Sequence, residues 1–288
     1  MPSGSTLHFA VIGDPIGHSR SPLMHNAAFR ALGIDADYTA IHVSREGLAD
    51  FLNSARTALN GFNITVPHKN AVIPFLDGIT PRAALAGSVN TVSVREGKLF
   101  GDTTDATGLE RAVREVFGLP LKGANVCILG CGGVVRALAF HLADAGCARI
   151  RILNRTAEKA ILLTDEVLKH APALDCGFAA LSDLPSVKKA LDGADLVIQC
   201  TSLGLRDGDG SPVDPGLIPV SACLFDTIYR ETEILVRCRE RGLRVSGGLP
   251  MLVHQGAESF RIWTGREAPV DVMRAAAEDK SSTEAVRG

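Results

Sequence analysis

The stretch that decides the fold is Val126-Cys127-Ile128-Leu129-Gly130-Cys131-Gly132-Gly133, a short apolar strand that runs into a glycine-rich turn. Glycines in such a turn let the backbone approach a pyrophosphate, and the N–H groups and positive dipole end of the following helix point at it. The third position of the dinucleotide fingerprint is Val135 instead of glycine, so the motif is incomplete by itself. The stretch nevertheless predicts the entrance to a dinucleotide site.

The next strand downstream, 149–153, ends at Asn154-Arg155-Thr156. Enzymes that bind NAD carry an acidic residue at this point, which binds the ribose hydroxyls. Arg155 instead offers a planar fork for a 2′-phosphate, and no carboxylate is present to repel that phosphate. We therefore predict NADP as the cofactor. The alternative is that Arg155 is an ordinary surface residue at the start of an exposed helix. Lys159, one turn further on, could bind the same phosphate or be an ordinary solvated residue.

Strands and helices alternate on both sides of this motif, which is typical of an α/β protein. Upstream we expect strands at 8–12, 38–43 and 61–66, and helices at 21–32, 47–58 and 69–75, in a sheet of mostly parallel strands that continues to about residue 104. A helix at 106–117 leads into a second, doubly wound unit with strands at 195–200 and 222–226 and an exposed loop at 206–212. The last apolar helix spans 251–263, and the tail from about Glu278 is expected to be frayed.

Composition restricts the class of protein. With 288 residues the chain can form two domains of ordinary size, and its net charge of −2 and 5% aromatic content favour a soluble α/β enzyme over a nucleic-acid binder. The sequence has no basic block, no tract of 18 apolar residues and no signal-peptide pattern, so we expect a cytoplasmic protein. Its seven cysteines are scattered without metal-ligand spacing, which predicts free thiols and no metal site.

Two upstream segments look suited to bind one small polyhydroxylated ring. The first, Gly61–Lys69, is a strand-like alternation that ends on a lysine, and the second, Ser88–Val92 followed by Gly101–Asp105, ends on an aspartate. Taken singly, such a lysine is usually a solvated surface residue and such an aspartate a turn former. Together, and upstream of a nucleotide-binding unit, a pair that moves protons indicates reduction of a carbonyl group or oxidation of an alcohol.

Four motifs, in order and at matching spacing, resemble the shikimate dehydrogenase family over about residues 8 to 270. They are Gly13-Asp14-Pro15-Ile16-Gly17-His18-Ser19-Arg20-Ser21-Pro22, Asn63-Ile64-Thr65-Val66-Pro67-His68-Lys69, Ala86-Gly87-Ser88-Val89-Asn90-Thr91, and Gly248-Leu249-Pro250-Met251-Leu252-Val253-His254-Gln255-Gly256-Ala257. The set is far more specific than a glycine turn alone. The last motif belongs with the first unit, so the N-terminal domain is expected to be discontinuous.

The resemblance implies an N-terminal α/β substrate-binding catalytic domain at 1–105 and 249–288 and a Rossmann-like, doubly wound NADP-binding domain at 106–248. It implies that Lys69 and Asp105 form the catalytic pair, in which the ammonium stabilises and protonates the carbonyl oxygen and Asp105 orients the ammonium. The residues implied to bind substrate are Ser19, Ser21, Asn63, Thr65, Asn90, Tyr229 and Gln255. The residues implied to bind the cofactor are Gly130, Gly132, Gly133, Asn154, Arg155, Thr156, Thr201, Gly248 and Met251.

Some of these residues have a competing interpretation. Ser21 could instead cap the helix that starts at Pro22, and Tyr229 could serve only in packing. His18 and His68 stand beside the motifs, but a neighbour in a strand or turn points elsewhere, so neither is predicted to be the catalytic base.

The chain also departs from the family pattern at six positions: Thr103, Ala106, Gln199, Leu205, Glu231 and Ile234. These changes spare the Lys69 and Asp105 pair, so they put substrate affinity and the shape of the cofactor pocket in question more than the reaction.

We therefore predict an NADP-dependent shikimate dehydrogenase, a monomer or homodimer with a small-molecule substrate. The alternatives are a quinate/shikimate or aminoshikimate dehydrogenase, or a non-catalytic nucleotide-binding sensor of the same fold. The presence of both Lys69 and Asp105 argues against the sensor, because a binding protein has no need of the pair.

Overall fold

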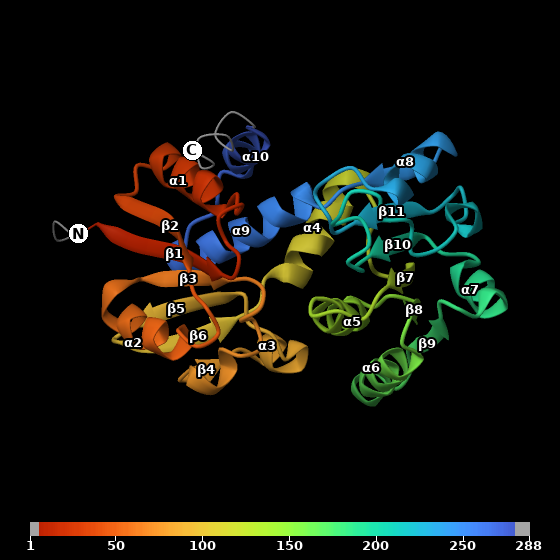
Figure 1. The fold of residues 1–288 in the computed structure, drawn as a ribbon, viewed down its shortest axis with the longest axis horizontal. Coiled ribbons are helices and arrows are strands. Elements are labelled where there is room, and N and C mark those ends of the chain that lie inside the picture. Colours follow the sequence, from red (N-terminus) through yellow and green to blue (C-terminus); the bar gives the residue numbers. More distant parts are fainter. Residues whose placement is uncertain (1–5, 280–288) are drawn as a thin grey trace. The chain divides into compact units, whose positions relative to one another are not determined.

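The computed structural model describes residues 6–279. In this part of the chain the backbone divides into two compact units: unit 1 contains the residues up to Gly108 and from Leu252 on, and unit 2 is Leu109–Met251. The chain enters unit 2 within α4 (Asp105–Phe117) and returns to unit 1 within α9 (Leu249–Thr264) (Figure 1). The boundaries expected from the sequence, after 105 and after 248, fall at the starts of these same two helices.

Unit 1 is built on a six-stranded sheet with the order β2-β1-β3-β5-β6-β4. Its strands are β1 (Leu7–Gly13), β2 (Ala36–His42), β3 (Gly61–Ile64), β4 (Gly78–Ile79), β5 (Thr91–Arg95) and β6 (Lys98–Asp102). Three of the five pairings are parallel, as predicted, and β5 is antiparallel to both β3 and β6. The antiparallel part arises because Glu96 and Gly97, both with positive φ, close a two-residue hairpin between β5 and β6.

The helices of unit 1 differ from the predicted ones at two places. Besides α4 and α9 they are α1 (Ser21–Ala31), α2 (Leu48–Ala58), α3 (Pro81–Ala86) and α10 (Val270–Glu278). The helix predicted at 69–75 is wrong: the segment forms turns and a short 3₁₀ helix at Ile73–Phe75, because Pro74 has no N–H to continue an α-helix. The competing interpretation of Ser21 as a helix cap is also wrong, since Ser21 lies inside α1 and Arg20 is the capping residue. Of the tail predicted to fray, the residues from 280 on lie outside the described part.

Unit 2 is a six-stranded, fully parallel sheet with the order β12-β11-β10-β7-β8-β9, which confirms the predicted doubly wound, Rossmann-like arrangement. Its strands are β7 (Asn125–Leu129), β8 (Arg149–Asn154), β9 (Asp175–Ala180), β10 (Leu196–Gln199), β11 (Cys223–Asp226) and β12 (Arg244–Ser246). Its helices are α5 (Val135–Asp144), α6 (Ala157–His170), α7 (Leu184–Leu191) and α8 (Glu233–Glu240), with a 3₁₀ turn at Pro215–Leu217.

The order of the strands fixes where unit 2 can bind a ligand. From β7 the chain proceeds through β8 to β9 in one direction, then returns to β10 and continues to β12 in the other. The switch therefore lies between β7 and β10, and open α/β sheets bind ligands outside the carboxyl ends of the strands at such a point. The glycine turn follows β7, so it stands at this switch.

Candidate active site

The glycine turn after β7 is held close to the end of β10. Gly130 has a φ of +107°, which a side chain would strain, and its N–H donates to the backbone oxygen of Leu153 at 2.7 Å. A Cβ at this position would lie 3.0 Å from the carbonyl carbon of Cys200. The turn can therefore approach the end of β10 this closely only because residue 130 is glycine.

Beside this turn lies a pocket of about 710 Å³. It is lined by Gly130, Cys131, Gly132, Asn154, Arg155, Thr156, Lys159, Leu181, Ser182, Cys200, Thr201, Ser202, Leu203, Leu205 and Pro212. Arg155 and Lys159 are exposed cations in it, and none of the described lining residues is acidic. A site with two cations and no carboxylate fits a ligand with a terminal phosphate, such as the 2′-phosphate of NADP.

Six of the nine predicted cofactor residues line this pocket: Gly130, Gly132, Asn154, Arg155, Thr156 and Thr201. Gly133, Gly248 and Met251 are not among the lining residues. Gly248 instead stands where a Cβ would come within 2.2 Å of the backbone oxygen of Thr227, so it serves close backbone packing at the start of α9.

At the carboxyl end of β11 lies Asp226, whose side chain is fully buried. One carboxylate oxygen accepts from the N–H of Ile228 at 2.9 Å and the other from the hydroxyl of Thr232 at 2.7 Å. Burial outweighs these hydrogen bonds and raises the pKa of Asp226 to about 6. The carboxyl group therefore carries a proton below about pH 6 and is charged above it.

Asp226→Asn is expected to remove part of the pH dependence of stability. Because the folded pKa is raised, the favourable contribution of Asp226 is complete below its unfolded pKa and is lost as the pH rises through about 6. The shift from 3.8 to about 6 corresponds to about 3 kcal/mol of unfolding free energy over the whole titration, of which about 1.4 kcal/mol is lost between pH 5 and pH 8. Urea unfolding at pH 5 and pH 8 should therefore show a smaller difference for the variant than for the wild type. Asp165→Asn, which changes an exposed carboxylate on α6, should keep the wild-type difference; an equal change in both variants would contradict the assignment to Asp226.

In unit 1, Lys69 and Asp105 are in direct contact. Lys69 lies in the turn after β3 and Asp105 is the first residue of α4, and Nζ donates to Oδ2 at 2.7 Å. The Asp105 side chain is 8% exposed and that of Lys69 is 23% exposed. The pair is thus buried on the aspartate side, with the ammonium partly open to solvent.

Asn90 holds the aspartate of this pair in place. Its Nδ2 donates to Oδ1 of Asp105 and to the Thr104 hydroxyl, both at 2.9 Å, and its Oδ1 accepts from the backbone N–H of Thr104 at 2.9 Å. Gln255 of α9 joins from the other side, since its Oε1 lies 3.3 Å from Asn90 Nδ2. The structure therefore brings four predicted residues, Lys69, Asp105, Asn90 and Gln255, into one connected cluster.

A second group of buried hydrogen bonds surrounds Asn63 and includes Tyr38, which the sequence analysis missed. The Tyr38 hydroxyl donates to Asn63 Oδ1 at 2.7 Å. The Asn63 amide nitrogen donates to the backbone oxygen of Asn90, to Thr91 and to Ser259. The Tyr38 ring, 1% exposed, stacks on the buried ring of His25 at 4.3 Å. Tyr38 thus fixes the position of Asn63, one of the predicted substrate-binding side chains.

Ser19 and Thr65 belong to the same unit and are half-buried. The Ser19 hydroxyl accepts from the N–H of Ser21 at 3.3 Å, and the N–H of Thr65 donates to the oxygen of Ile12 at 2.9 Å. Tyr229, by contrast, belongs to unit 2, where it is 45% exposed in the turn after β11.

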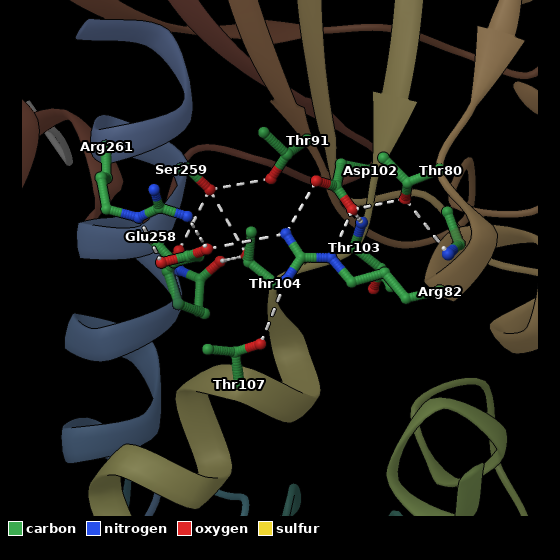
Figure 2. A network of polar contacts seen from close by, with 12 residues as sticks. Thr80, Arg82, Thr91, Asp102, Thr103, Thr104, Thr107, Glu258, Ser259 and Arg261 are labelled. Carbon is green, nitrogen blue, oxygen red and sulfur yellow. Dashed lines mark hydrogen bonds and ion pairs between the residues drawn. The ribbon is translucent and has the colours of Figure 1, made fainter. Parts of the chain in front are cut away.

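A network of charged residues fixes the segment that leads into Asp105. Figure 2 shows Arg82 reaching between Asp102 and Glu258: its Nε and Nη2 donate to the two oxygens of Asp102 at 2.6 and 2.7 Å, and Nη2 lies 3.6 Å from Glu258. Asp102 also accepts from the N–H of Thr103 at 2.7 Å. Glu258, 2% exposed, is further paired with Arg261 at 2.7 Å. Sequence patterns gave no signal for this network, because its members come from α3, β6 and α9.

The two histidines beside the motifs lie in different surroundings. His68 is fully buried and its Nε2 donates to the backbone oxygen of Val43 at 2.6 Å, while His18 is exposed.

All seven cysteines are free, and Cys131, in the glycine turn, is half-buried. Within residues 6–279, no cluster of three or more His, Cys, Asp or Glu side chains could hold a metal ion. No helix in that range has the length and apolar character needed to cross a membrane.

The departures from the family pattern fall in different environments. Ile234 is buried in the core of unit 2, and Glu231 is exposed and pairs with Arg239 at 2.6 Å. Leu205 lines the pocket. Gln199 does not line it, but its amide donates to the backbone oxygen of Leu203, which does. Near the Lys69 pair, Ala106 is buried, and the hydroxyl of Thr103 is buried with no hydrogen-bond partner among the described residues.

A parallel sheet with a cationic pocket at its switch point, joined to a unit that carries a buried lysine–aspartate pair, defines a two-unit dinucleotide-dependent oxidoreductase. Family models match along the chain: the shikimate dehydrogenase substrate binding domain at 11–92, shikimate / quinate 5-dehydrogenase at 111–204, and the shikimate 5'-dehydrogenase C-terminal domain at 248–278. The chain belongs to the shikimate dehydrogenase family, which confirms the resemblance.

Relatives support this over nearly the whole length. A shikimate dehydrogenase (NADP(+)) of Symbiobacterium thermophilum is 42% identical, covering 93% of this chain and 92% of that protein. One from Methanothermobacter thermautotrophicus is 40% identical, covering 95% and 96%. The crystal structure of shikimate 5-dehydrogenase from Thermus thermophilus in complex with NADP(H) and shikimate is 39% identical, with a TM-score of 0.84 over 94% of this chain and 98% of that one.

Proposed function

We propose that this chain catalyses the reversible NADP-dependent reduction of 3-dehydroshikimate to shikimate, in the pathway to chorismate and the aromatic amino acids. The observation that carries the proposal is the Lys69–Asp105 contact of 2.7 Å, with the aspartate buried and held by Asn90. Asn90 holds one oxygen of the buried Asp105 carboxylate, and the other oxygen orients the Lys69 ammonium. A proton donor must be positioned in this way to act in catalysis.

In the reduction, bound NADPH supplies a hydride to the ketone carbon of the ring. Negative charge then develops on the ketone oxygen, and the Lys69 ammonium stabilises it and donates a proton, which completes the alcohol. Asp105 keeps the ammonium directed at that oxygen and hydrogen-bonds a ring hydroxyl. In the oxidation direction the neutral Lys69 amine accepts the hydroxyl proton.

We assign substrate binding to the domain formed by 1–105 and 249–288. Ser19, Ser21, Asn63, Thr65, Asn90 and Gln255, together with Tyr229 of the other domain, are proposed to bind the carboxylate and ring hydroxyls. Neutral donors and acceptors suit these groups, because they satisfy several hydroxyls without the desolvation penalty of a buried charge. The connected cluster around Asn90 and the hydrogen bond from Tyr38 to Asn63 support the assignment.

We assign NADP binding to the domain 106–248, with Arg155 at the 2′-phosphate. The six residues that line the pocket support this. We propose that Gly133, Gly248 and Met251 also belong to the cofactor site. We further infer that the enzyme works in the cytoplasm, as a monomer or homodimer.

Shikimate is expected to be preferred over quinate by at least about tenfold in kcat/KM. Quinate carries an extra tertiary hydroxyl on the carbon that bears its carboxylate, and its saturated ring is puckered at that end. Ser21 is only 6% exposed, which leaves little freedom to accommodate the extra group. One buried unpaired polar group costs about 1–3 kcal/mol, which corresponds to about 5- to 150-fold, and tenfold lies towards the lower end of this range.

A steady-state assay with shikimate and quinate, each with NADP and with NAD, tests both the preference and the proposed function. Turnover with shikimate and NADP above all other combinations is the expected result. Equal efficiency with quinate and NAD would favour a quinate/shikimate dehydrogenase, and no turnover in any combination would favour a non-catalytic sensor.

A further inference from the structure

Gln199, the last residue of β10, has a fully buried side chain whose hydrogen bonds all go to one loop. Its Nε2 donates to the backbone oxygen of Leu203 at 2.9 Å and to that of Thr201 at 3.4 Å. Its Oε1 accepts from the backbone N–H of Thr201 at 2.8 Å. A single side chain at the end of a strand therefore satisfies three backbone groups of the loop that follows it.

This loop, residues 200–205, is one wall of the cationic pocket. All of its residues except Gly204 line that pocket. Gly204 instead packs against the neighbouring turn: it has a φ of +105°, and a Cβ there would lie 2.6 Å from the Thr232 side chain. The pocket loop thus lines the pocket with most of its residues and packs against Thr232 through Gly204. The buried Gln199 amide hydrogen-bonds to its backbone.

Gln199 is itself anchored to the next strand. Its backbone oxygen accepts from both the N–H and the hydroxyl of Thr227, at 3.0 and 2.9 Å. Gln199 is not among the lining residues of the pocket and its side chain is 0% exposed. Any effect of this side chain on a ligand in the pocket must therefore be transmitted through the loop.

We propose that Gln199 is a positioning residue for the cofactor, which holds the pocket loop in its binding conformation before NADP arrives. The inference rests on the proposed binding of NADP in this pocket. A loop that is ordered in advance does not lose conformational freedom when the ligand binds, so its affinity is higher than that of a loop ordered by the ligand. Loss of the amide is expected to raise the Kd for NADP about five- to tenfold, the effect of one net hydrogen bond.

The test uses Gln199→Met, which keeps the length of the side chain and removes its hydrogen bonds. Hydrogen exchange of residues 200–205 is measured by mass spectrometry in the protein without cofactor, and the Kd for NADP by calorimetry. Faster exchange of this loop together with a five- to tenfold higher Kd is expected. The matched control is Asp195→Ala, which removes a side-chain acceptor for the N–H of Asn125 just before the opposite end of β10. It should change neither the exchange of 200–205 nor the Kd.

Two results overturn the inference and leave the pocket assignment intact. Unchanged exchange of 200–205 in Gln199→Met would show that the amide does not hold the loop. Faster exchange with an unchanged Kd, while Arg155→Ala weakens NADP binding, would show that the loop does not matter for the cofactor. Unchanged Kd in both variants would instead overturn the pocket assignment, and this inference with it. If Gln199→Met does not fold, Gln199→Asn, which keeps the amide but is one carbon shorter and reaches less far into the loop, gives the same readouts.

Discussion

Lys69→Ala is expected to lower kcat by roughly 10²–10⁴-fold, while the KM for shikimate changes much less. The reason is that the ammonium acts mainly when charge develops on the ketone oxygen, so its removal affects the transition state more than the bound substrate. Steady-state kinetics in both directions, at saturating NADP or NADPH, give the two parameters separately. Because Lys69 belongs to unit 1 and the proposed cofactor pocket to unit 2, the Kd for NADP should stay at its wild-type value.

Lys98→Ala is the matched control for this variant, since Lys98 is an exposed lysine of the same unit, at the start of β6. It should retain wild-type kcat. Near-normal turnover of Lys69→Ala would remove Lys69 from the mechanism. An equal rise in KM without a loss of kcat would limit Lys69 to substrate binding.

Arg155→Ala is expected to raise the KM for NADP about 10- to 100-fold and to leave the KM for NAD nearly unchanged. A hydrogen bond to a charged group contributes about 1.5–3 kcal/mol, and only NADP has the 2′-phosphate that this guanidinium can bind. The pocket offers Lys159 as a second cation, so part of the phosphate affinity should remain. The ratio of the two KM values, measured at a fixed shikimate concentration, is the quantity to compare.

Lys169→Ala provides the control for Arg155, because Lys169 is an exposed cation in the last turn of α6, the helix that carries Lys159 in its first turn. The ratio of KM values should not change in that variant. If Arg155→Ala weakens the binding of NADP and NAD to the same degree, the side chain does not bind the phosphate and acts only on the shape of the pocket.

Local sequence patterns were enough for the features that depend on neighbouring residues. The apolar run at 126–129 followed by Gly130 predicted a strand and a turn, because a short apolar run and a glycine turn are patterns of neighbouring residues. Arg155 was predicted to face the cofactor from its place after β8, and it lines the pocket. The segment 69–75 was predicted as a helix and is not one, because Pro74 removes a backbone donor within it.

The supports of the candidate site could not be predicted in the same way. Tyr38, Ser259 and Glu258 carry no motif, and their partners are far away in the sequence, as with the contact between Asn63 and Ser259. Gln199 stood out in the sequence only as a departure, and its role became visible when its amide was found bonded to the pocket loop. Long-range contacts of this kind depend on how strands and helices pack, which short patterns do not contain.

The sequence by itself predicted the family, the two α/β units, a lysine and an aspartate for the site, and NADP as the cofactor. These follow from residue types in motifs whose chemistry is local. Only the tertiary structure decided that Asn90 holds Asp105, that Tyr38 hydrogen-bonds to Asn63, and that Gln199 supports the pocket loop. The physical reason is that a buried polar group must find a hydrogen-bond partner, and the fold alone decides which distant residue is close enough to be that partner.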